Sequence, residues 1–302
     1  MPTTNPMVTQ NQEPRPLQGL ERQLRLYART FSRNGSAMLG LVLVTSFLLI
    51  ALFAPWIAPD PDAASGSIHM VQKLLPPSSD HWFGTDEMGN DILSRVILGS
   101  RTSLQIGLIV TLIAALIGVP LGIIAGYVGG KTQEVIMRIT DIFLSVPGLV
   151  LAIAIVGALG PGIVNAMLAL SVVWWPGYVR LVQAKTLSLK NEVYIEAARM
   201  MGAGPLRIVF IHILPNCISP IVVKVSMDMG MAILSAASLG FLGLGAQPPL
   251  PEWGAMISIG RNYLPQWWWY AAFPGVAIYL TVLGFNLIGD GLRDALDPKQ
   301  RS

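Results

Sequence analysis

The sequence predicts an all-α integral membrane protein with six transmembrane helices, and its composition, hydropathy and charge spacing each support that prediction. Of the 302 residues, 53% are hydrophobic and only 12% are charged, whereas about 25% of the residues in a typical soluble domain are charged. The mean hydropathy is +0.57, and the charged side chains are clustered, which leaves long uncharged runs. These features disfavour a water-soluble fold, a disordered chain and a collagen-like repeat.

The N-terminal segment is polar and precedes the first predicted span. Residues 1–35 carry five arginines and are expected to form a cytoplasmic tail that ends in a basic amphipathic stretch. The next run, 36–58, has 23 residues and no charge, and a helix needs about 20 such residues to cross a bilayer core. The run is too long for the apolar region of a signal peptide, and no clean cleavage site follows it. It is therefore expected to be a retained first transmembrane helix.

The remaining uncharged runs supply five more helices. The run 142–179 has 38 residues, which is too long for one span, and glycines and a proline between positions 157 and 162 divide it into two helices. The fifth helix begins before its uncharged run and therefore includes two charged residues. The predicted spans are 36–58, 103–127, 140–158, 162–181, 217–244 and 269–288.

Lysine and arginine residues set the expected orientation. With the N-terminus inside, the cytoplasmic segments hold 15 of the 20 basic residues and the outer segments hold four. Both termini, including a tail at 291–302, are therefore expected in the cytoplasm. A five-helix core at 102–290 follows a large outer loop at 59–101. The core carries a large cytoplasmic loop at about 183–215, and the residues between its last two spans form a second outer segment.

The large cytoplasmic loop contains the most informative pattern. Residues 196–198 are good helix formers, Gly202 can adopt backbone angles that other residues avoid, and Pro205 suits the first turn of a second helix. The pattern predicts two short helices joined by a glycine elbow. Such an elbow could protrude from the membrane as a docking lever, or it could be an ordinary surface loop, and its shape alone does not choose between the two.

This loop resembles the EAA signature of the permease subunits of ABC importers. In the signature, Glu-Ala-Ala is followed after three residues by glycine, and after eleven more residues by Leu-Pro. Every spacing matches here. One departure is His212, which stands where many members have isoleucine. In that family, the loop forms a coupling helix that docks into a cleft on a cytoplasmic ATPase. The resemblance implies ATPase-docking and hinge positions at Glu196, Ala197, Ala198, Gly202, Ala203, Gly204 and Pro205.

Other stretches narrow the resemblance to one branch. They read HWFGTDEMGND at 81–91, SLGFLGLGAQPPLPEWG at 238–254 and GDGLRDALDP at 289–298. Together they resemble the C-type permeases of dipeptide, oligopeptide and nickel importers, over nearly the whole chain after residue 30. One departure is Asn90, where the family usually has arginine, so no salt bridge is predicted from that position. The stretch RNYLPQWWWYAAFPG resembles the dipeptide and D,D-dipeptide members more than the nickel members.

The resemblance implies a type I ABC importer permease fold in the cytoplasmic (inner) membrane of a prokaryote. It implies a transport subunit that moves di- and oligopeptides and is not itself an enzyme. A second homologous permease would form a heterodimer with it, and two cytoplasmic ABC ATPases would hold ATP and Mg. An extracytoplasmic substrate-binding protein would deliver the cargo. The chain itself is expected to bind no cofactor and no nucleic acid, and to contact membrane lipid.

Charged residues within the fifth span form a second candidate site. Lys224 and Asp228 are four residues apart and therefore share one face of the helix, and ionisable residues inside a membrane usually have a function. They could line a translocation path and contact a zwitterionic substrate, or they could neutralise each other inside the protein. Near the start of the third span, Asp141 follows Arg138 by three residues, which predicts an interfacial ion pair.

Several other patterns have less specific interpretations. The stretch AGYVGGKT at 125–132 fits a loose phosphate-binding pattern, but it follows a predicted membrane helix rather than a strand, so a nucleotide site is disfavoured. Ala114, Gly118, Gly122 and Gly126 recur every four residues, which suits close helix packing within the chain or between subunits. The single cysteine excludes an intrachain disulfide, and the three histidines are too scattered to predict a metal site.

Two other function classes remain as rivals to the importer subunit. A secondary transporter would use Lys224 and Asp228 with an ion gradient, and an ATP-binding enzyme would use residues 125–132. The exact cargo also stays open among dipeptides, oligopeptides, D,D-dipeptides, glutathione and nickel.

Overall fold

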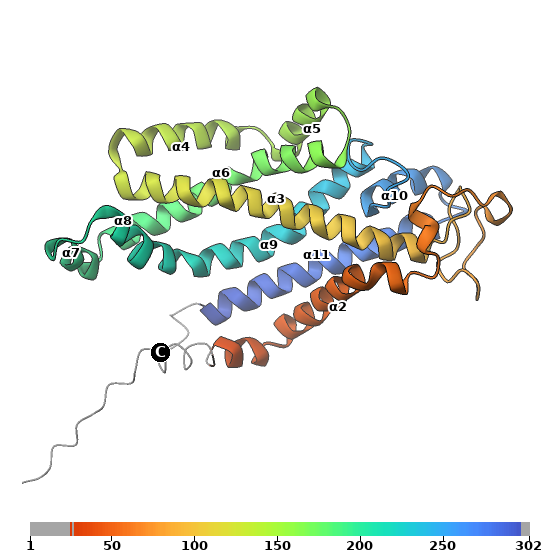
Figure 1. Ribbon diagram of the computed structural model, residues 1–302, viewed down its shortest axis with the longest axis horizontal. Coiled ribbons are helices and arrows are strands. Elements are labelled where there is room, and N and C mark those ends of the chain that lie inside the picture. The colour runs from red at the N-terminus through yellow and green to blue at the C-terminus, as the bar shows by residue number, and fades with distance from the viewer. Residues whose placement is uncertain (1–24, 26, 297–302) are drawn as a thin grey trace, which may run out of the picture.

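The protein is a bundle of long helices, as the computed structural model shows (Figure 1). The structure describes residue 25 and residues 27–296, and within these residues the only β-type pairing is an isolated bridge between Thr85 and Asp91. The prediction of an all-α protein is confirmed. The helices are α2 (Gly35–Ile57), α3 (Ile92–Val128), α4 (Gly130–Ser145), α5 (Gly148–Leu159), α6 (Ile163–Lys190), α7 (Val193–Met200), α8 (Pro205–Ile208), α9 (Leu214–Phe241), α10 (Trp253–Gly260) and α11 (Trp269–Leu296). Short 3₁₀ turns lie at Pro61–Ala64, Met70–Gln72 and Arg261–Tyr263, and a π-helical turn lies at Val209–Ile213.

The first helix, α2, packs along α11 and α3. It begins where the Asn34 side chain accepts hydrogen bonds from the backbone N–H groups of Ser36 and Ala37, which satisfies two donors that a helix start leaves free. Gly40 faces the backbone of α11, and a Cβ atom there would lie 2.8 Å from the carbonyl oxygen of Gly284. Two glycines therefore allow α2 and α11 to approach closely.

Helix α3 is 37 residues long and begins eleven residues before the predicted span. The Asp91 carboxylate accepts a 2.8 Å hydrogen bond from the backbone N–H of Ser94 and so caps the helix. The last ten residues of the predicted outer loop 59–101 are therefore the first ten residues of α3. Hydropathy alone missed this extension because Arg95 and Arg101 interrupt the apolar run.

The third predicted span is not one straight helix. Helices α4 and α5 pass as a membrane span only together, and they meet at a bend of 88°. The bend lies at Val146 and Pro147, where Val146 has the extended backbone (φ −98°, ψ 134°) that a following proline favours. The predicted ion pair of Asp141 with Arg138 is also wrong, because α4 packs on α6 and Asp141 accepts a 2.6 Å hydrogen bond from Arg180.

The six predicted spans correspond to α2, α3, the α4–α5 pair, α6, α9 and α11. By length and composition, α2, α3, α11 and the continuous helix Pro205–Phe241 could each cross a membrane, and the bent pair would add a fifth crossing if it forms one span. Helix α6 has 28 residues and packs along α3. It is less apolar than the others because it contains Pro176, Arg180 and Lys185.

The small-residue stripe of α3 holds α3 and α6 together. A Cβ atom added at Gly122 would lie 2.8 Å from the carbonyl oxygen of Val179 and 2.8 Å from the Cβ atom of Val182. Gly118 and Gly126 meet α6 in the same way, at Tyr178 and Thr186. The stripe therefore packs helices within this chain, which confirms the first of its two interpretations.

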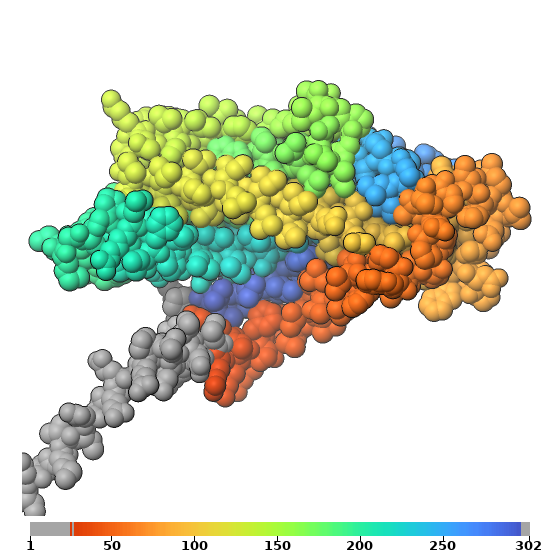
Figure 2. Space-filling view, in the orientation of Figure 1, coloured from red at the N-terminus to blue at the C-terminus, as the bar shows by residue number. Residues whose placement is uncertain are grey.

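The connecting segments gather at two opposite ends of the bundle (Figure 1). Helices α7 and α8 lie at one end, together with the start of α2 and the end of α11. The segment between α2 and α3 lies at the other end with α10, and Figure 2 shows its residues projecting beyond the helices. This grouping matches the predicted division into two sides. Most of the predicted tail 1–35 and part of the tail 291–302 lie outside the described residues.

Candidate functional site

The loop between α6 and α9 forms the predicted elbow. Helix α7 ends at Met200, and Gly202 then takes a left-handed backbone angle, φ +84°. The backbone N–H of Gly202 donates to the carbonyl of Arg199 at 2.9 Å, and that of Ala203 donates to the carbonyl of Ala198 at 3.0 Å. These bonds satisfy carbonyl groups at the end of α7, as glycine-containing helix ends usually do. Pro205 then opens the next helix, as expected.

The side chains of the elbow divide into an inner and an outer set. Ile195 and Ala198 are buried, so Ala198 packs against the body of the protein, whereas Glu196, Ala197 and Gly202 are exposed. Ala203 is half-buried and packs against a hydrophobic cluster of the protein body, whereas the next two residues, Gly204 and Pro205, are exposed. The sequence-predicted residues are thus brought into one short segment at the tip of the bundle.

Sequence reasoning missed three apolar residues of the same elbow. Val193, Met200 and Met201 are 80%, 89% and 83% exposed. Exposed apolar patches mark surfaces that contact other molecules, and methionine side chains adapt readily to a partner. The available signal was the Met-Met pair between the Glu-Ala-Ala triplet and the glycine. The end of the bundle therefore presents an apolar knob beside the exposed Glu196 carboxylate.

Lys224 and Asp228 form an ion pair in the middle of the bundle. The Lys224 Nζ atom lies 3.0 Å from the Asp228 Oδ2 atom and 3.3 Å from its Oδ1 atom. The Lys224 side chain is 27% exposed and that of Asp228 is 12% exposed. The ammonium also lies 5.0 Å from the centre of the Tyr178 ring on α6, which is a favourable position for a cation. The pair is thus held on α9 by both charge and packing.

The pair lies at the junction of two of three cavities along α9. A cavity of about 570 Å³ reaches from the pair to Lys185 and Arg293, and one of about 430 Å³ reaches from the pair to Leu149 on α5. A third cavity of about 590 Å³ begins at Leu149 and continues toward α10. Neighbouring cavities share lining residues, so the three cavities form a row along α9. We call it the α9 furrow.

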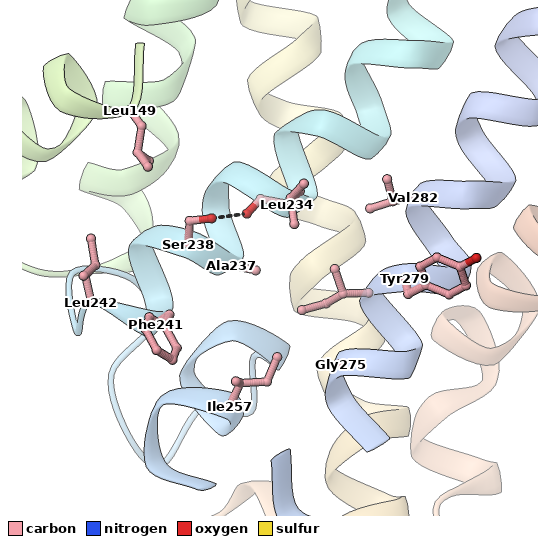
Figure 3. A pocket seen from close by; sticks show the side chains of 11 residues that line it. Leu149, Leu234, Ala237, Ser238, Phe241, Leu242, Ile257, Gly275, Tyr279 and Val282 are labelled. Carbon is pink, nitrogen blue, oxygen red and sulfur yellow. Dashed lines mark hydrogen bonds between the residues drawn. The ribbon is translucent and has the colours of Figure 1, made fainter. Parts of the chain in front are cut away.

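The two ends of the α9 furrow differ in chemistry. Figure 3 shows the end near α10, where Leu149, Leu234, Phe241, Ile257 and Tyr279 surround an apolar hollow. The Ser238 hydroxyl in this hollow donates a 2.8 Å hydrogen bond to the carbonyl of Leu234 in its own helix, so it offers little to a ligand. At the other end, the cations and the carboxylate face the space. Sequence reasoning found only the ion pair, since the other lining residues resemble ordinary apolar helix residues.

The outer stretch 81–91 contains a buried polar network. Asp86, Asn90 and Asp91 are almost fully buried. The Asp86 carboxylate accepts hydrogen bonds from the backbone N–H groups of Met88 and Asn90, at 2.9 and 2.8 Å. Its other oxygen lies 3.4 Å from the Nε atom of Arg95. The stretch therefore fixes the start of α3.

Two further carboxylates, those of Glu252 and Glu87, accept hydrogen bonds at the same end of the protein. Glu252 caps α10 by accepting 2.9 Å hydrogen bonds from the backbone N–H groups of Gly254 and Ala255. Burial raises the pKa of the Glu252 carboxyl above its usual range, and the two backbone hydrogen bonds oppose that shift in pKa. The Tyr270 hydroxyl donates to the Glu87 carboxylate and so joins α11 to the outer stretch.

The structure provides no phosphate-binding loop at residues 125–132. These residues form the end of α3, a turn with positive φ angles at Gly129 and Gly130, and the start of α4. A phosphate-binding loop joins a strand to a helix, whereas this turn joins two helices. Among the residues that the structure describes, no group of three or more histidine, cysteine or acidic side chains is arranged to hold a metal ion.

Comparisons with known proteins agree with this geometry. The family described as "Binding-protein-dependent transport system inner membrane component" matches residues 118–302. The family described as "N-terminal TM domain of oligopeptide transport permease C" matches residues 22–77. Together the two matches cover most of the chain.

Individual relatives match over almost their full length. The "Probable D,D-dipeptide transport system permease protein DdpC" of Escherichia coli (strain K12) is 51% identical over 259 residues, which are 85% of this chain and 86% of that protein. The "Dipeptide transport system permease protein DppC" of the same organism is 51% identical over 275 residues, which are 89% of this chain and 91% of that protein. A solved structure of the MetNI methionine ABC transporter in an inward-facing conformation has a TM-score of 0.56 and 22% identity. The match covers 67% of this chain and 96% of that one, and it supports the fold.

Proposed function

The chain belongs to the family of binding-protein-dependent transport system inner membrane components, and from this premise we propose that it is the permease subunit of an ATP-driven importer of di- and oligopeptides. The observation that carries the proposal is the elbow of α7 and α8, which has the spacing and the left-handed glycine of a coupling loop and presents an exposed apolar knob. The named relatives at about 50% identity supply the peptide class of the cargo. The chain is a transport subunit and not an enzyme.

The proposal extends to the partners and the orientation. Two ABC ATPases with bound ATP and Mg would dock on the elbow, so this end of the bundle and both termini would face the cytoplasm of a prokaryotic cell. A second homologous permease would cover the open side of the α9 furrow, where Leu149, Leu234 and Tyr279 expose 42%, 42% and 64% of their surface. An extracytoplasmic binding protein would dock at the opposite end, beside α10.

Motion of the elbow would reach the furrow through one continuous helix. Residues 205–241 form a single helical segment that starts at the elbow and carries the ion pair. ATP binding would close the two ATPases, move residues 192–207 and turn the bundle outward, and hydrolysis would reset it. ATP and Mg act in the partner subunits, so this chain needs no cofactor of its own.

The ion pair suits a zwitterionic cargo. A peptide carries a carboxylate and an ammonium group at its ends, and Lys224 and Asp228 provide the complementary charges 3.0 Å apart. Both side chains border the α9 furrow. We propose that they contact the peptide termini during passage and pair with each other when the furrow is empty.

Reconstitution of the importer tests the proposal. The chain would be placed in proteoliposomes with its second permease, its ATPases and its binding protein, and uptake of a radiolabelled dipeptide would be measured with and without ATP. Glu196→Ala and Gly202→Asp variants that insert and assemble should lose most ATP-driven uptake. Glu134→Ala, which removes an exposed carboxylate on α4 outside the elbow, serves as the matched control. Full uptake by both elbow variants would refute the coupling role.

The buried ion pair favours one rival function, a secondary transporter driven by an ion gradient. The same proteoliposomes separate the two functions, because a secondary transporter would import without ATP and would stop when an uncoupler is added. Competition by unlabelled D,D-dipeptide, glutathione or nickel would then rank the alternative cargoes. ATP-dependent uptake that an uncoupler does not reduce supports the importer subunit.

A further inference from the structure

A separate groove lies at the base of the elbow, away from the α9 furrow. It has a volume of about 800 Å³ and shares no lining residue with the three cavities of the furrow. Its apolar walls come from the end of α3 and from the segment that follows the elbow. The wall residues are Val119, Pro120, Ile123, Ile124, Tyr127, Val128, Pro205, Leu206, Val209, Phe210 and Leu214.

The groove opens toward the outside of the bundle. Ile124 and Val128 on α3 expose 43% and 58% of their surface, and Leu206 and Phe210 on the opposite wall expose 73% and 62%. These side chains lie close to the end of a membrane-spanning helix, where the hydrocarbon region gives way to lipid headgroups. Acyl chains can therefore enter the groove from the bilayer.

Two cations line this groove, and both lie near the Tyr127 ring. The Lys190 Nζ atom lies 5.9 Å from the centre of the Tyr127 ring and donates a 2.7 Å hydrogen bond to the Tyr127 carbonyl. The Arg199 guanidinium lies 5.6 Å from the same ring. An ammonium has three donors and a guanidinium has five, so both cations keep donors for another ligand. None of the described residues that line the groove carries a carboxylate.

From these contacts we infer that the groove is a binding site for an anionic phospholipid of the cytoplasmic leaflet. Its phosphate group sits between Lys190 and Arg199, and an acyl chain lies along Ile124 and Phe210. An apolar groove that also contains two cations matches the two parts of such a lipid, because basic pockets at the cytoplasmic side of membrane helices bind anionic headgroups. The assignment of the leaflet rests on the proposed function, since that function sets the orientation.

The site links lipid to the coupling loop. Arg199 belongs to α7, and Lys190 is the last residue of α6, so a phosphate between them joins the elbow to the body of the bundle. The bound lipid would steady the elbow in the position from which it meets an ATPase.

Native mass spectrometry of the purified transporter complex tests this site. Dioleoyl-phosphatidylglycerol is the probe, dioleoyl-phosphatidylcholine is the neutral comparison, and inorganic phosphate is the competitor. One phosphatidylglycerol should be retained in preference to phosphatidylcholine, and phosphate should not displace it. Removal of one cation, by Lys190→Gln or Arg199→Gln, should weaken retention about fivefold, and removal of both about 25-fold.

Matched variants distinguish lipid binding in the groove from lipid attraction by cations elsewhere on the surface. Lys131→Gln with Arg138→Gln removes two cations from α4 outside the groove and should leave retention unchanged. Val128→Trp keeps both cations but fills the groove, and it should displace the lipid. Equal retention of phosphatidylcholine, displacement by phosphate, or unchanged retention in the double cation variant would overturn the site.

A photo-crosslinking residue at Val128 distinguishes a lipid from a protein occupant. A lipid adduct supports the inference, and an adduct to another subunit overturns it. Lipid retention is measured without transport, so a failure of peptide uptake with normal lipid retention would count against the proposed function alone. Normal peptide uptake without selective retention would count against the lipid site alone.

Discussion

Replacing Lys224 and Asp228 with apolar residues tests whether this ion pair serves the stability of the protein or the transport of the peptide. At 3.0 Å, two unit charges attract each other by roughly 5 kcal/mol at an effective dielectric constant of about 20. Much of this attraction offsets the cost of removing both charges from water. Loss of Lys224 leaves the Asp228 carboxylate unpaired and almost buried, so Lys224→Met should lower the free energy of unfolding by about 3–5 kcal/mol. Asp228→Leu should cost less, because the Lys224 side chain is 27% exposed.

The double variant Lys224→Met/Asp228→Leu should behave differently in the two assays. Replacing a buried ion pair with apolar side chains of similar volume is often neutral or stabilising, so the thermal midpoint in detergent should return close to that of the parent. Uptake of a dipeptide in proteoliposomes should nevertheless fall at least tenfold, because the proposed contacts with the peptide termini are gone. Stability and transport therefore separate in this variant.

A second ion pair of the same chain serves as the control. Arg180 and Asp141 lie 2.6 Å apart, but their side chains are 54% and 48% exposed, and exposed pairs contribute little because water screens them. The double variant Arg180→Gln/Asp141→Asn should leave the thermal midpoint and the uptake nearly unchanged. The reasoning fails if the Lys224→Met/Asp228→Leu protein is stable and imports the dipeptide at the parental rate.

Three further predictions concern glycines and a buried carboxyl. Gly122→Ala should destabilise the protein by about 1–3 kcal/mol because its Cβ would press on α6, whereas Gly157→Ala on an open face of α5 should not; thermal midpoints of the two variants compare them directly. Gly202→Val should lower ATP-driven uptake more than Gly202→Asn, because asparagine tolerates φ +84° better than a β-branched residue does; equal losses would contradict a conformational role. Burial raises the pKa of Glu252, so the folded state takes up its proton at higher pH than the unfolded chain. This group should therefore stabilise the fold as the pH falls from neutral, and Glu252→Gln should remove that part of the pH dependence of the midpoint.

The sequence was sufficient for the features that depend on local composition. Uncharged runs located the spans, and the glycine and proline spacing located the elbow, because hydropathy and backbone freedom are properties of neighbouring residues. The sequence was not sufficient for the start of α3. The cap at Asp91 begins the helix within a stretch that contains Arg95 and Arg101, and hydropathy counts such a stretch as outside the span. Sequence reasoning also paired Asp141 with the nearest cation in sequence, whereas the bend at Pro147 and the packing of α4 on α6 bring Arg180 closer.

The candidate site was only partly predictable for a related reason. The α9 furrow is made by side chains from α5, α6, α9, α10 and α11, and no pattern within one helix indicates that such residues border a common space. Charged residues in a span are the exception, because their burial is costly and therefore informative. The exposed methionines of the elbow could have been suspected, but their exposure depends on where Ile195 and Ala198 pack.

The distance between the elbow and the ion pair constrains how they can be coupled. Lys224 lies 19 residues beyond Pro205 in one helical segment, which corresponds to about 28 Å. The segment is not a rigid rod over this distance, because the π-helical turn at Val209–Ile213 interrupts the regular hydrogen-bond pattern between them. Such turns are frequent at functional sites. We expect the elbow to tilt about this turn, so that the segment beyond it rotates as a body and alters the packing of Lys224 against Tyr178. Deletion of one residue within Val209–Ile213 should restore regular helix and uncouple ATP hydrolysis from uptake, and coupled transport by an assembled deletion variant would refute the hinge.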